Sequence, residues 1–158
     1  MRHKKVEKRK PEADKIYQNK MVTKFVNRMM KDGKKAVAEK NFYDALDLIK
    51  EKNSADPLEV FERALQTVGP KQEVKARRVG GASYQVPAEV KGDRKVSLAI
   101  RWLIGAARKR SNKEYHSFSK KLAAELWDAS QNLGEAIKKR DTMQKQAEAN
   151  RAFAHFRW

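Results

Sequence analysis

The sequence predicts a mainly α-helical protein, a six-helix bundle with a protruding two-stranded β-hairpin arm and basic N- and C-terminal extensions. Two patterns support this fold class. Apolar residues recur at helical spacing in six separate stretches. Residues 72–91 instead alternate with a period of two on both sides of a glycine pair, which is typical of a hairpin. A third observation concerns partners rather than fold: 37 Lys and Arg face 20 Asp and Glu.

The first helix is expected to begin after Asn19, a good N-cap, and to end near Gly33. Its inner face is predicted to carry Val22, Phe25, Val26, Met29 and Met30. The second helix is predicted to place inward Ala38, Phe42, Ala45, Leu46 and Ile49.

The third helix has a clear start at Asp56-Pro57, with an acidic cap and proline in the first turn. Its apolar stripe is predicted to be Leu58, Phe61, Leu65 and Val68, and Gly69-Pro70 ends it. Asp93 is expected to cap a fourth helix with an inner face of Val96, Ile100, Leu103, Ile104 and Ala107. A fifth helix is predicted on Tyr115, Phe118, Leu122, Leu126 and Ala129, and a more polar sixth helix from about Gly134 to Glu148 on Ile137, Met143 and Ala147.

Residues 72–91 are predicted to form the arm. Gly80 and Gly81 accept the positive φ that tight hairpin turns require, and Pro87 places its strand at an edge. No other stretch resembles a sheet that the hairpin could join, so we expect it to project from the helices. Arg77, Arg78 and Tyr84 then suit phosphate contact and base stacking, although charges that guard an exposed strand would give the same pattern.

The predicted domain boundaries follow composition. Residues 1–18 form a basic N-terminal extension, residues 19–150 a single helical domain that includes the arm, and residues 151–158 a basic and aromatic C-terminal tail. Phe153, Phe156 and Trp158 in this tail suit stacking on RNA. Docking of the tail back onto the domain is an equal alternative.

The charge is segregated along the chain. Residues 1–40 hold 14 basic and 5 acidic side chains, residues 41–70 hold 3 and 6, and residues 71–118 hold 12 and 4. This distribution favours one face toward a polyanion, and nucleic acid fits better than a membrane. The longest apolar run, 98–107, is too short to span a bilayer, and a secretory signal is not expected. The absence of Cys is compatible with a cytoplasmic protein.

Basic clusters at predicted helix ends are the candidate phosphate contacts. Lys34 and Lys35 follow a glycine turn at the start of a helix, where free N–H groups attract anions. Two further clusters lie at the end of the fourth helix and on the sixth. The candidate set is Lys34, Lys35, Arg77, Arg78, Arg108, Lys109, Arg110, Lys138, Lys139 and Arg140. An ordinary solvated turn, or cations that only complement a helix dipole, are the structural alternatives.

The sequence predicts no enzyme. His3, His116 and His155 have no metal-ligand spacing, and neither a phosphate-binding loop nor a nucleophile motif occurs, so no catalytic site, metal or cofactor is expected. Sequence physics alone leaves RNA and DNA open. A DNA-bending architectural protein with β-arms is the nearest alternative, and an RNA-modifying enzyme is the alternative from another class.

Four segments carry a resemblance. EVKARRVGGASYQVPAEV (73–90), VTKFVNRMMKDGKK (22–35), AIRWLIGAARKR (99–110) and AEANRAFAHFRW (147–158) resemble the bacterial ribosomal small-subunit protein seven family in that family's order. The resemblance spans nearly the whole chain.

The resemblance implies a cytoplasmic ribosomal protein that binds the 3′ major domain of 16S rRNA and nucleates assembly of the 30S head. It implies that the arm, with Arg77, Arg78, Gly80, Gly81 and Tyr84, lines the exit site near tRNA and mRNA. It also implies rRNA contacts at Lys34 and Lys35, at Arg77 and Arg78 on the arm, and at Arg108, Lys109 and Arg110. The implied neighbours are the small-subunit proteins nine, eleven, thirteen and nineteen. Two departures put local contacts in doubt: a longer segment at 111–121, and Gln144 where many relatives have His.

Overall fold

The computed structural model describes residues 11–53 and 55–156. The elements follow the predicted order: α1 (Lys20–Met29), α2 (Lys35–Asn53), α3 (Pro57–Val68), β1 (Gln72–Val79), β2 (Ala82–Glu89), α4 (Gly92–Lys109), α5 (Phe118–Ser130), α6 (Glu135–Ala149) and the 3₁₀ helix η1 (Arg151–Phe156). The predicted fold class, mostly helical with a β-hairpin arm, is confirmed.

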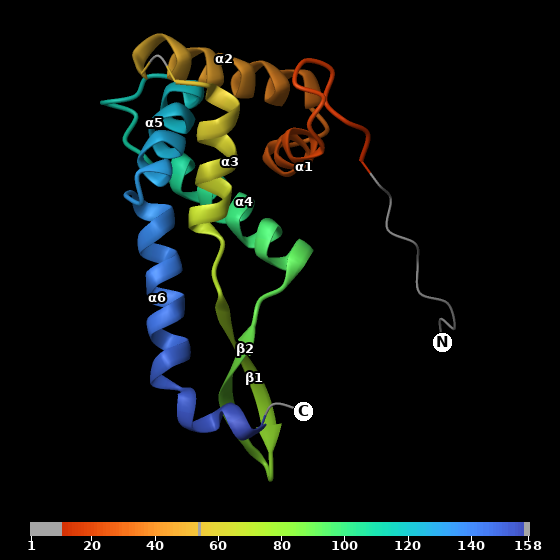
Figure 1. Ribbon diagram of the computed structural model, residues 1–158, viewed down its shortest axis with the longest axis vertical. Helices are drawn as coiled ribbons and strands as arrows, with labels where there is room; N and C mark the ends of the chain where they lie inside the picture. Colours follow the sequence, from red (N-terminus) through yellow and green to blue (C-terminus); the bar gives the residue numbers. More distant parts are fainter. Residues whose placement is uncertain (1–10, 54, 157–158) are drawn as a thin grey trace.

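The first five helices form a body at one end, and α6 and the hairpin leave this body side by side (Figure 1). α5 packs against α2, α3 and α4, while α6 packs along β1 and η1 packs on β2. The sixth helix therefore packs on α3, α4 and α5 and also supports the arm.

The centre of the body is built on three aromatic rings from three helices. Phe25 of α1, Phe42 of α2 and Phe61 of α3 are fully buried, with ring centroids 5.3 to 5.4 Å apart. These separations and tilts suit aromatic packing. Each ring comes from an apolar stripe that the sequence predicted. The inner faces of α1 and α2 are confirmed, whereas α3 buries Val60 and Ala64 more fully than the predicted Leu58 and Leu65, which are half-buried.

Two predicted helix starts are confirmed and two are wrong. The Asn19 side chain accepts a hydrogen bond from the Met21 N–H, and Asp56 accepts one from the Leu58 N–H. Asp93 does not cap α4: it lies in the first turn and pairs with Lys24, while Lys91 occupies the cap position without a side-chain hydrogen bond. α5 begins at Phe118 because Ser117 caps it, so Tyr115 lies in the preceding loop.

The described part of the N-terminal extension is folded onto the body. Asp14 is buried and accepts hydrogen bonds from the backbone N–H groups of Ile16 and Tyr17 and from the Tyr43 hydroxyl. Burial raises the pKa of the Tyr43 hydroxyl, and its hydrogen bond to Asp14 raises it further. The remainder of the predicted extension, residues 1–10, lies outside the described residues.

The hairpin has the predicted strands and turn. Val79 pairs with Ala82, and the intervening Gly80 and Gly81 have φ of +57° and +89°, as a tight hairpin turn requires. Although the hairpin was expected to project from the helices, its root packs against them. Val86 is only 1% exposed, and Val90 joins the core of the body. Period-two alternation shows that a strand has two faces, but it does not show that a polar helix covers one of them.

Candidate nucleic-acid interface

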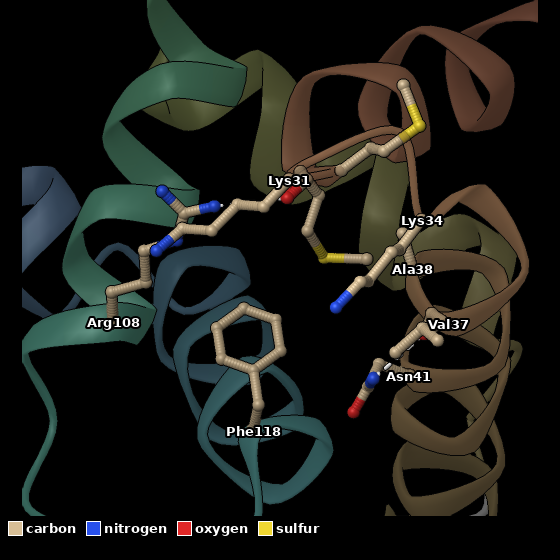
Figure 2. A pocket seen from close by; sticks show the side chains of 9 residues that line it. Lys31, Lys34, Val37, Ala38, Asn41, Arg108 and Phe118 are labelled. Atoms are coloured by element: carbon tan, nitrogen blue, oxygen red, sulfur yellow. Dashed lines mark hydrogen bonds between the residues drawn. The ribbon is translucent and has the colours of Figure 1, made fainter.

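A basic hollow lies where the α1–α2 loop meets the end of α4. It has a volume of about 300 Å³, and its lining includes Lys31, Lys34 and Arg108 above an apolar floor. Figure 2 shows Lys34 and Arg108 on opposite sides of the hollow, with the Phe118 ring between them. Two clusters that lie more than 70 residues apart in the sequence thus converge on one site.

Arg108 is anchored while it remains exposed. Its guanidinium Nη2 donates a hydrogen bond to the Met29 carbonyl at 3.0 Å, at the C-terminal end of α1. This bond satisfies a terminal carbonyl that the helix itself cannot pair. Arg has several N–H donors, so the same group keeps donors available for a phosphate.

Further exposed cations lie at the end of α4 and at the start of α6. Lys138 pairs with Glu135 at 2.6 Å, and both side chains are exposed. This hydrogen bond lowers the pKa of the Glu135 carboxyl, and the charges of Lys138, Lys109 and Arg110 lower it further. Lys109 is exposed in the last turn of α4. We call Lys31, Lys34, Arg108, Lys109 and Lys138 the helix-end surface.

Arg110 does not share this surface. Its side chain is 16% exposed, and its Nε donates to Glu125 at 2.7 Å while a second nitrogen donates to Asp128. Glu125 is fully buried and also accepts the Ala136 N–H at the start of α6. These bonds raise the pKa of Arg110 despite its burial. The residue joins α4, α5 and α6, and a role in holding these helices together accounts for its position.

Arg140 is also directed inward. Its Nη1 donates to the Thr67 carbonyl at 2.8 Å and to the Asn132 side chain at 2.9 Å, so it ties α6 to the end of α3. Lys139 is exposed. Lys35 is exposed as well and pairs with Glu39 at 3.6 Å within α2.

The two arginines of the arm lie on opposite faces of the hairpin. Arg77 is opposite Tyr84 in the register and is half-buried, whereas Arg78 is opposite Ser83 and exposed. Directly paired residues share a face, and successive residues alternate. Arg78 is therefore on the open face, and Arg77 is on the face that carries Tyr84.

At the root of the arm, the Glu73 carboxylate forms ion pairs with two basic side chains. It is buried and accepts from Arg94 at 2.9 Å, with Lys75 at 3.3 Å. Burial alone would raise the pKa of the Glu73 carboxyl, but these two partners outweigh it and lower the pKa. The pair with Arg94 fastens the hairpin to α4, while Lys75 lies in β1 itself.

The C-terminal segment, Arg151–Phe156, is docked on the arm. The Tyr84 ring lies 5.3 Å from that of Phe153 and 5.1 Å from that of Phe156. Of the two alternatives left open by the sequence, the structure shows docking for these rings. Trp158 lies outside the described residues.

Sequence reasoning missed part of the hollow. Lys31 belonged to the basic loop but was not among the candidates, and Met29, Met30 and Phe118 appeared only as core residues. The apolar spacing gave no signal that Phe118 would lie under three cations, because that requires α5 to start beside the α1–α2 loop.

The described residues hold no cluster of three or more His, Asp and Glu that suits a metal ion. None of the helices in the described part of the chain is long and apolar enough to cross a membrane.

Exposed cations gathered at helix ends, together with a cationic hairpin arm, define the class: a basic nucleic-acid-binding protein. The model of the family described as ribosomal protein S7p/S5e matches residues 1–151, and the chain belongs to that family. It is a family of ribosomal proteins, not an enzyme family.

Known proteins with a similar sequence are small ribosomal subunit proteins uS7. The chain is 54% identical to that of Desulfitobacterium hafniense (strain Y51) over 97% of its length and 96% of the relative's. It is 57% identical to the protein from Moorella thermoacetica over 92% of each chain, and 55% identical to that from Lawsonia intracellularis over 97% of this chain and 96% of the relative's.

Proposed function

We propose that this ribosomal protein is a primary binder of the 16S rRNA 3′ major domain and nucleates assembly of the 30S head in the cytoplasm. The observation that carries the proposal is the helix-end surface. Arg108 and Lys34 lie on opposite sides of one hollow, and Lys109 and Lys138 are exposed at the end of α4 and the start of α6. These charges lie at or next to the ends of packed helices, so little backbone freedom is lost when folded RNA binds.

The arm serves a second role in this proposal. Its open face presents Arg78 near the turn, and Gly80 and Gly81 keep the tip narrow. A narrow cationic tip fits an RNA groove or a tRNA backbone. We infer that the arm lines the exit site and contacts tRNA and the mRNA path, and that small-subunit proteins nine, eleven, thirteen and nineteen are neighbours, as the resemblance implies.

The test is a charge-removal pair with a matched control. The double variant Lys31→Ala with Lys34→Ala removes two cations from the hollow. Lys50→Ala with Lys52→Ala removes two exposed cations from the other end of α2, beside the acidic part of the chain. Affinity for a 3′ major-domain RNA fragment is measured across a range of salt concentrations.

The hollow variant should bind roughly tenfold more weakly, and its slope of log K against log salt should be smaller by about one to two. The control variant should keep both values of the wild-type protein. Equal losses in both variants would show that net charge, rather than this surface, determines binding. Equal affinity of the wild-type protein for duplex DNA would favour the architectural alternative.

A further inference from the structure

The outer half of the arm is held by an aromatic cluster. The Tyr84 ring of β2 contacts the rings of both Phe153 and Phe156 of η1, whose centroids are 6.5 Å apart and whose planes are nearly parallel, at 13°. The His155 ring is 3.9 Å from that of Phe156. This cluster lies between the outer half of β2 and the C-terminal segment.

The C-terminal segment is itself fixed to α6. Asn150 ends α6, its side chain donates to the Gln146 carbonyl at 2.7 Å, and its carbonyl accepts the Phe153 N–H at 3.0 Å. The chain then turns from the end of α6 across to β2 (Figure 1). One strand therefore rests on α6 and the other on η1.

The root and the outer half of the arm are held by different contacts. The root has the Glu73 ion pairs and the buried Val86. Beyond Val86, the Tyr84 ring joins β2 to the C-terminal segment. An isolated two-stranded hairpin is marginally stable in water, so its outer half depends on such support.

We propose that Phe153 and Phe156 are positioning residues that hold the arm against α6 through Tyr84, so that Arg78 meets RNA from a fixed position. The inference rests on the proposed RNA-binding function for its last step only. An arm that is already fixed loses less conformational freedom when it binds RNA than a mobile arm does. A released arm that makes the same contacts with RNA would therefore bind more weakly. The two phenylalanines act through the arm and need no contact with RNA.

The experiment uses the full chain with Phe153→Ala and Phe156→Ala together. The conservative pair Phe153→Tyr and Phe156→Tyr keeps both rings, and Leu133→Ala removes an exposed apolar side chain (63% exposed) away from the arm. Hydrogen exchange of the amides of residues 76–83 is measured in the free protein. Two lost aromatic contacts should speed this exchange about tenfold in the alanine variant alone. Exchange in α4 and α5 should stay unchanged.

Affinity for the 3′ major-domain RNA fragment is then measured with the same proteins. The alanine variant should bind about threefold to tenfold more weakly, and the tyrosine pair should restore both exchange and affinity. Unchanged amide exchange in the alanine variant would refute the proposal that Phe153 and Phe156 hold the arm. Faster exchange with unchanged affinity would overturn the positioning role, and weaker binding with unchanged exchange would show that the rings contact RNA instead.

Absence of RNA binding by the wild-type protein would refute the proposed function, while the exchange data would still test whether the two phenylalanines hold the arm. If the double alanine variant loses its helical circular dichroism, Phe156→Ala alone, which leaves Phe153 on Tyr84, takes its place with the same criteria.

Discussion

Replacement of Arg110 by alanine tests whether the run Arg108-Lys109-Arg110 divides between RNA binding and folding. Glu125 is fully buried and keeps only the Ala136 N–H once Arg110 is gone. Breaking a buried ion pair by removing one partner costs about 3–5 kcal/mol. Because Arg110 is still 16% exposed, we take the lower end, about 3 kcal/mol. For a chain of this length that loss lowers Tm by about 6–12 °C.

The matched control is Lys109→Ala, next in sequence but exposed. Its stability should change by no more than about 0.5 kcal/mol. Its RNA affinity should fall, and its salt slope should decrease by about one. The Arg110 variant, measured at a temperature where it is folded, should keep the wild-type slope of log K against log salt.

Thermal melting followed by circular dichroism and RNA titration at several salt concentrations provide both readouts. The reasoning is refuted if Arg110→Ala melts like the wild-type protein and loses a phosphate contact in the salt slope. A cycle with Glu125→Gln adds a second check, because the coupling between the two positions should exceed about 1 kcal/mol.

Three further predictions concern stability. Gly134→Ala should destabilise by about 1–3 kcal/mol in chemical denaturation, since φ is +96° and a Cβ would lie 3.0 Å from Glu125 Oε1. Gly105→Ala, in the interior of α4 with nothing within 4 Å of its Cβ, should instead stabilise by about 0.5–1 kcal/mol, and a loss there would contradict the packing described. Arg94→Ala should cost about 1 kcal/mol at pH 7, a value reduced because Arg94 is 52% exposed. The pKa of Glu73 is depressed in the folded state, so this cost should be present above the ordinary value of 4.5 and disappear as pH falls through the folded value; a cost that persists at pH 2 would exclude the ion pair as its cause.

Helix existence and inner faces could be predicted because each depends on local periodicity. Val22, Phe25 and Phe42 are buried as their spacing requires. The hairpin could be predicted because glycine at positive φ is a local requirement of its turn. What could not be predicted depends on contacts between distant elements. The packing of α6 along β1 is one example, and the approach of Phe118 to the basic loop is another.

The candidate site was predicted as several clusters of basic residues. The structure shows that side chains of the same cluster point in different directions. In the arm, alternation alone gave the needed information: Arg77 and Arg78 are consecutive in a strand, so they had to lie on opposite faces. Only the identity of the covered face required the structure, since it depends on Tyr84 meeting the C-terminal segment.

The same geometric argument applies to the run at the end of α4, where successive residues of a helix differ by about 100° in direction. Three adjacent cations at the end of a helix therefore cannot all face one RNA. Arg108 binds the end of α1, Lys109 is exposed, and Arg110 meets α5. The sequence did contain a signal for this division: Glu125 and Asp128 are spaced i, i+3 on one face of a predicted helix, a pair of carboxylates that calls for a cation. In this run of basic residues, the carboxylate pair on an otherwise apolar helical face therefore identifies Arg110 as an arginine that stabilises the fold and does not bind RNA.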